Sequence, residues 1–207
     1  MNSFSYPLRK GKASIKHLIN LLKWHSRDRR FDPPPELVKV LNDLDADKVL
    51  HSSTTLFKHL VGTYRLLKQW NISEEVCIAG LFHSVYGTQT FKGFLISPLQ
   101  REKLKAVIPD YSEELVYYFY IQDKKRLFES LKSDRKIVLK NRLNGHEIPL
   151  SNQKFEDLLK TRFADYIEQM SRMKFSGNFI QQKLMQSQAL INPQEYKAIS
   201  SALLAKN

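Results

Sequence analysis

The segment from Val76 to Tyr86 constrains the fold more than any other part of the chain. Its residues, VCIAGLFHSVY, carry no charge, and their apolar side chains surround a helix on every side. A helix that is apolar all round is covered by neighbours on every side, which places it at the centre of a domain. His83 and Ser84 lie inside this segment, and a buried imidazole needs a partner for each ring nitrogen.

The remaining sequence predicts an all-α protein with one hairpin. Asn144-Gly145 lies between two apolar-rich runs, and this dipeptide favours a hairpin turn in which both central residues have positive φ. We therefore expect a small β-hairpin insertion near residues 137–150. Apolar periodicity and N-cap residues predict helices over residues 36–44, 53–70, 73–86, 98–108, 112–132, 152–173, 177–190 and 194–205. Ser53 or Thr54 is the expected cap of the second of these helices, and Ser73 that of the third. Three consecutive prolines, 33–35, divide the chain into a basic N-terminal helix with a Pro-rich linker (1–35) and a helical domain (36–207).

Composition excludes several classes of protein. The longest uncharged run, 76–91, has 16 residues, fewer than the roughly 20 apolar residues of a transmembrane helix. The single cysteine, Cys77, rules out an internal disulfide framework and is typical of a reducing compartment, so we expect a cytoplasmic protein. Residues 1–25 contain no acid and form an amphipathic basic pattern, which leaves a mitochondrial location as the alternative. No feature predicts the oligomeric state.

Positive charge is concentrated in two segments. The formal net charge is +12, and residues 1–31 and 124–142 each contain eight Lys or Arg with few acids. Such segments attract an anion, which we expect to be a small-molecule substrate, although a solvated basic face is an alternative. Nucleic acid is possible but not favoured, because segment 124–142 has one aromatic residue and no RNA-binding signature. Three residues of this segment are candidates to bind a substrate phosphate: Arg126, Lys136 and Arg142.

Three polar residues are expected to converge in the core. His59 faces inward beside the apolar stripe of the helix over 53–70, and His83 lies in the central segment. On the helix over 152–173, Asp165 lies about 20° from Leu158, at the edge of the apolar stripe. Two His and one Asp form a ligand set for Mn²⁺, Fe²⁺ or Zn²⁺. Taken singly, each residue is better explained as structural, either as a satisfied core histidine or as an aspartate paired with a nearby arginine, but the three together favour a metal site.

His51 is a further candidate. It precedes His59 by eight residues, about two helical turns if one helix spans both. It is either a fourth ligand or a residue at the helix boundary.

These residues resemble a known family. His59-Leu-Val-Gly-Thr-Tyr, then Ala79-Gly-Leu-Phe-His83-Ser84, then Phe163-Ala-Asp165 are similar to the HD superfamily, over about residues 51–173. That family has a His on one helix, a His-Asp pair on the next and an Asp on a later helix, and the rhythm here is nearest to the (p)ppGpp hydrolase branch. The resemblance implies an all-α fold, metal ligands at His59, His83 and Asp165, and metal-dependent hydrolysis of a phosphorylated or nucleotide-like small molecule.

The sequence departs from the family at two places. Ser84 stands where the family has Asp, and Tyr86-Gly87 replace an acidic pair that assists water activation. The run His83-Ser-Val-Tyr-Gly-Thr88 also looks like the hallmark of an uncharacterised HD-like family. Ser84 and Tyr86 are therefore candidate catalytic residues. Two alternatives remain: an iron-dependent oxygenase on an HD-like scaffold, and a catalytically inactive module that binds through its basic surfaces.

Overall fold

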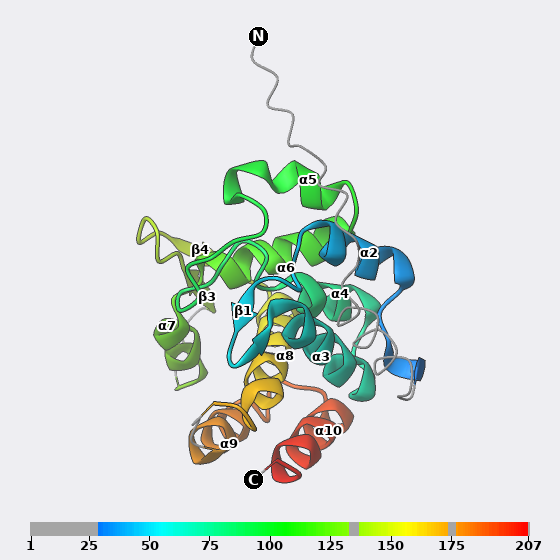
Figure 1. The fold of residues 1–207 in the computed structure, drawn as a ribbon. Coiled ribbons are helices and arrows are strands. Elements are labelled where there is room, and N and C mark those ends of the chain that lie inside the picture. The colour runs from blue at the N-terminus through cyan, green and yellow to red at the C-terminus, as the bar shows by residue number, and fades with distance from the viewer. Residues whose placement is uncertain (1–28, 133–136, 174–176, 207) are drawn as a thin grey trace. The chain divides into compact units, whose positions relative to one another are not determined.

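The computed structural model describes residues 29–132, 137–173 and 177–206 (Figure 1). The predicted basic helix falls on residues outside these ranges. Residues Phe31–Asn207 form one unit. The elements in chain order are η1 (Arg29–Phe31), α2 (Pro35–Asp43), β1 (Leu50–His51), β2 (Thr54–Thr55), α3 (Leu56–Gln69), α4 (Glu74–Phe82), η2 (Pro98–Gln100), α5 (Arg101–Lys105), α6 (Asp110–Ile121), α7 (Lys124–Glu129), η3 (Ser130–Lys132), β3 (Val138–Lys140), β4 (Glu147–Pro149), α8 (Asn152–Gln169), α9 (Gly177–Gln186) and α10 (Pro193–Leu204).

Helix α4 lies at the centre of this unit, as its sequence predicts. Every residue from Val76 to Phe82 is buried, and α4 contacts α3, α6 and α8 (Figure 1). The predicted all-α fold with a small β insertion is confirmed: the described residues are mainly helical, with two small antiparallel sheets, β1–β2 and β3–β4. Among the described helices, none is both long enough and apolar enough to span a bilayer.

The start of α3 differs from the prediction. Residues 50–55 form a hairpin in which Leu50 pairs with Thr55 and His51 with Thr54. Ser52 and Ser53 make its two-residue turn, with φ of 47° and 62°, and two positive φ values define the turn type that matches strand twist. The helix therefore begins at Leu56, and its cap is Thr55, whose hydroxyl accepts from the Lys58 amide, rather than Ser53 or Thr54.

The central helix is shorter than predicted. It ends at Phe82, and His83 is its C-cap. The chain then turns through i→i+3 hydrogen bonds, from the Val85 amide to Phe82 O and from the Gly87 amide to Ser84 O. Gly87 has φ of 84°, a conformation that an α-helix cannot contain. Ser73 precedes the helix as expected, but its side chain makes no capping hydrogen bond.

Two further predictions were wrong in detail. The helix predicted over 112–132 breaks after Ile121, because Asp123 caps a new helix by accepting from the amides of Lys125 and Arg126. The hairpin near 137–150 is present, but β3 and β4 are joined by residues 141–146 rather than by a two-residue turn. Of Asn144 and Gly145, only Gly145 has a positive φ, at 77°.

Candidate metal centre

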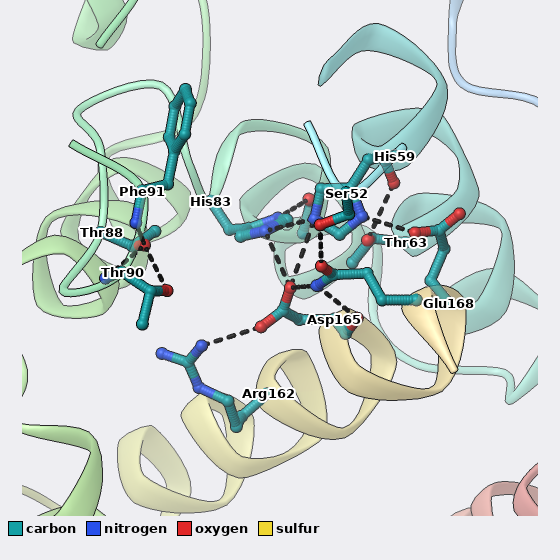
Figure 2. Close-up of polar contacts among 12 residues, drawn as sticks. Ser52, His59, Thr63, His83, Thr88, Thr90, Phe91, Arg162, Asp165 and Glu168 are labelled. Carbon is teal, nitrogen blue, oxygen red and sulfur yellow. Dashed lines mark hydrogen bonds and ion pairs between the residues drawn. The ribbon is translucent and has the colours of Figure 1, made fainter. Parts of the chain in front are cut away.

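Three helices bring the predicted ligand set together. His59 comes from α3, His83 from the end of α4 and Asp165 from α8 (Figure 2). The Nε2 atoms of the two histidines lie 3.1 Å apart. Asp165 Oδ1 lies 3.3 Å from His59 Nε2 and 3.6 Å from His83 Nε2. All three side chains are buried, and their potential ligand atoms lie within 4.8 Å of one another.

The outer nitrogen of each imidazole is already bonded. His83 Nδ1 lies 2.7 Å from Gly80 O, and because a carbonyl only accepts, Nδ1 carries the proton. His59 Nδ1 lies 2.5 Å from Glu168 Oε2. Burial raises the pKa of Glu168, but the hydrogen bonds from His59 and Arg172 outweigh it and lower that pKa overall, so Glu168 is ionised and accepts. Both Nε2 atoms therefore point into the cluster.

The cluster consequently needs a proton or a metal ion among its three inward atoms. His83 Nε2 carries a lone pair, Asp165 Oδ1 is an acceptor, and His59 Nε2 faces both. Three acceptors at this separation repel one another unless a proton or a metal ion lies among them. Burial lowers the pKa of His83. Burial also opposes charge on His59, but its bonds with Asp165 and Glu168 outweigh that effect and raise its pKa. Without a metal, His59 therefore takes up a proton more readily than His83 does.

Asp165 is held in its charged form from several sides. Burial opposes its ionisation, but bonds with His59 and His83 and the charge of Arg162 lower its pKa well below the usual range. Arg162 Nη1 donates to Asp165 Oδ2 at 2.8 Å. Gln169 Nε2 donates to Oδ1 at 2.6 Å. The carboxylate thus makes both contacts that the sequence left as alternatives, one with an arginine and one with the histidines.

Several supporting residues were not predicted. Glu168 and Gln169 follow Asp165 by three and four residues, the spacing that places side chains on one face of a helix, and this was the available signal. Arg172 bonds Glu168 in turn. Gly62 on α3 leaves space for the Glu168 side chain, because a Cβ there would lie 2.7 Å from Glu168 Cγ. Metal-binding histidines characteristically donate their other N–H to such a carboxylate or carbonyl.

His51 lies near the cluster, but not because one helix spans it and His59, the arrangement considered from the sequence. No helix joins it to His59; it lies in β1, and the hairpin places its ring 4.5 Å from that of His59. Its Nε2 is buried, and no group in the described part of the chain forms a hydrogen bond with it. Burial, then the nearby His59 and His83, lowers the pKa of His51 to about 4. His51 is therefore neutral at pH 7 and retains a lone pair, although it is not one of the three clustered residues.

A cavity of about 610 Å³ opens beside the cluster. Asp165, His51 and Ser84 contribute to its wall, together with Thr88, Lys124 and Arg162. Ser84 is fully buried at the inner end of the turn after α4. The cluster therefore borders a space large enough for a small molecule.

The other predicted site residues lie elsewhere. Tyr86 is not one of the described residues that line this cavity. Its hydroxyl instead donates to Glu113 at 2.8 Å. Arg126 is exposed and paired with Glu129. The Arg142 guanidinium lies over the Tyr120 ring and donates to Tyr120 O. Lys136 is outside the described residues. The catalytic and phosphate-binding roles of these residues stay predictions.

Comparison with known proteins gives a partial match. Residues 40–124 are similar to a family described as a domain of unknown function (DUF6817). The matched stretch contains His51, His59 and His83, but it ends before Asp165. No curated protein matches the chain.

Proposed function

We propose that this protein is a metal-dependent hydrolase of a phosphorylated or nucleotide-like small molecule, on a scaffold similar to that of the HD superfamily. The observation that carries the proposal is the convergence of His59 Nε2, His83 Nε2 and Asp165 Oδ1 within 3.1–3.6 Å. Because both Nδ1 atoms are committed to outer partners, the three inward atoms present lone pairs to one point. This donor set suits Mn²⁺, Fe²⁺ or Zn²⁺.

The chain's own residues have distinct parts in this proposal. His59, His83 and Asp165 would hold the ion, and the unpartnered Nε2 of His51 is available as a fourth ligand. Glu168 and Gly80 O orient the imidazoles. A divalent ion bound there would act as a Lewis acid that polarises a phosphoryl oxygen and would lower the pKa of a water molecule bound to it. Ser84 lines the cavity, and in this proposal its hydroxyl would bond a substrate oxygen.

One feature favours a second candidate. Two histidines and one carboxylate with open positions are the ligand set of non-haem iron oxygenases, and Ser84 replaces the acidic ligand that would fill a further position. Iron retained by the purified protein, with no release of phosphate from phosphate esters, would favour this oxygenase. Manganese or zinc with hydrolytic activity would favour the hydrolase.

The test is metal content by mass spectrometry on protein purified without chelator. We expect near-stoichiometric metal in the wild type and little in His83→Ala, because one of three ligands is lost. His146→Ala is the matched control, since His146 is exposed on the β3–β4 loop, and it should retain metal. Absence of metal from the wild type after reconstitution, or unchanged metal in His83→Ala, would refute the proposal and leave the inactive binding module.

A further inference from the structure

Arg162 is the largest fully buried side chain of the described residues, at 1% exposed. Its Nη1 donates to Asp165, and its guanidinium carbon lies 3.7 Å from the centre of the Phe119 ring. These contacts hold the plane of the group. Its Nε and Nη2 are buried and have no hydrogen-bond partner among the described residues. In Figure 2 these two nitrogens face away from Asp165.

The two unpartnered nitrogens form one recognition edge. In a planar guanidinium, Nε–H and the neighbouring Nη2–H point in parallel, and this fork matches two oxygens of a phosphate or carboxylate. A buried donor without an acceptor destabilises the folded state. The fold therefore maintains, at a cost in stability, an anion-binding edge on the residue that also contacts Asp165.

A second cation lines the same cavity. Lys124, the first residue of α7, borders it together with Arg162, and its Nζ donates to Thr90 Oγ1 at 2.9 Å. Burial and then the charge of Arg162 lower the pKa of Lys124 to about 8. Among the described residues, the charged groups of the cavity wall are thus two cations and Asp165. Asp165 is already bonded by Arg162, Gln169 and the histidines.

We propose that Arg162 and Lys124 form an anion subsite that binds the phosphoryl group of the substrate beside the metal ligands. The fork of Arg162 takes two phosphoryl oxygens, Lys124 adds a positive charge, and Thr88 and Thr90 line the same space. The identification of this anion as the substrate's phosphoryl group rests on the proposed function. The subsite itself does not depend on the proposed function, because both of its cations are side chains of this protein.

The experiment measures binding of inorganic phosphate to the full chain by calorimetry, with and without added Mn²⁺, at constant ionic strength set with chloride. Arg162→Lys keeps the charge but removes the fork, and we expect it to weaken phosphate binding by roughly tenfold or more. Lys124→Met should also weaken it. Lys125→Met is the matched control, because Lys125 is adjacent and 86% exposed, and it should bind as the wild type does.

Equal affinity in Arg162→Lys and wild type, or equal losses in Lys124→Met and Lys125→Met, would overturn the subsite. Because Arg162 is buried, the wild type offers a second readout. Its Arg162 Nε–H resonance, assigned by its absence from Arg162→Lys or by sequential assignment, should shift saturably with phosphate, and an unshifted resonance would contradict the proposal. Phosphate binding through Arg162 in a protein that takes up no metal would refute the hydrolase but retain the subsite. Metal uptake together with phosphate binding that is unchanged in Arg162→Lys would retain the hydrolase but refute the subsite.

Discussion

Glu168 determines which nitrogen of His59 faces the cluster of His59, His83 and Asp165. Its carboxylate accepts from Nδ1, while Arg172 and the space over Gly62 keep the carboxylate in place. Removing it would free the imidazole to rotate or to change tautomer without removing a ligand. In the proposed metal site, affinity for the ion would depend at this scale on residues that do not touch it.

Glu168→Gln is therefore expected to weaken metal affinity by about 10- to 100-fold, because a neutral amide supports the imidazole less strongly than a carboxylate does. The measurement is a competitive titration with a metal-binding dye. Glu156→Gln is the control, since Glu156 lies on the same helix but bonds Lys160. Unchanged affinity in Glu168→Gln, or an equal loss in Glu156→Gln, would contradict the assignment.

At the scale of elements, the contact between α3 and α4 sets the distance between His59 and His83. Gly80 lies in this contact, and a Cβ there would fall 2.3 Å from Leu67 Cδ1. Leu67 is fully buried, so it has little room to move. The absence of a side chain at Gly80 therefore lets the two helices approach closely enough for both imidazoles to meet Asp165.

We expect Gly80→Ala to destabilise the protein. Overpacking costs about 1–3 kcal/mol, and the better helix propensity of Ala returns about 1 kcal/mol. The net loss in the free energy of unfolding should thus reach about 2 kcal/mol in urea denaturation. In a Leu67→Ala background the added methyl enters vacated space, so the same change should stabilise. Equal effects in the two backgrounds would show that Leu67 is not the cause.

At the scale of the whole molecule, the cavity is assembled from segments far apart in the chain: the β1–β2 hairpin, the turn after α4, the start of α7 and the face of α8. Bringing two cations to one partly buried space opposes folding, because like charges repel and burial removes their hydration. The lowered pKa of Lys124 records that cost. Functional sites commonly retain such costs.

This cost predicts a pH dependence of stability. The pKa of Lys124 is about 8 in the folded protein and 10.5 ordinarily. Between these values the unfolded chain binds more protons, so wild-type stability rises with pH there. The free energy of unfolding of the wild type, minus that of Lys124→Met, should therefore increase from pH 8 to 10.5 and be flat below pH 7. The same pH dependence of this difference for Lys125→Met would show that the loss of any surface cation produces the effect.

Much of this architecture could be predicted from the sequence. The uncharged segment around Ala79 requires a central helix, because no other placement covers all its faces. Apolar periodicity then predicts that His59 and Asp165 face inward. Two inward histidines and an inward aspartate together predict a shared site. These are local properties of helices, which the spacing of residues along the chain specifies.

Other features depended on tertiary structure. The hairpin that brings His51 to His59 requires positive φ at Ser52 and Ser53, a conformation that no residue type there favours. The helix predicted over 112–132 breaks because Asp123 caps α7 and its amide bonds Lys140 O, a partner distant in sequence. The unpartnered edge of Arg162 is likewise invisible in sequence, since it depends on which neighbours surround a buried guanidinium. Helical periodicity determined which side chains face inward, and the packing of distant segments decided which of them meet.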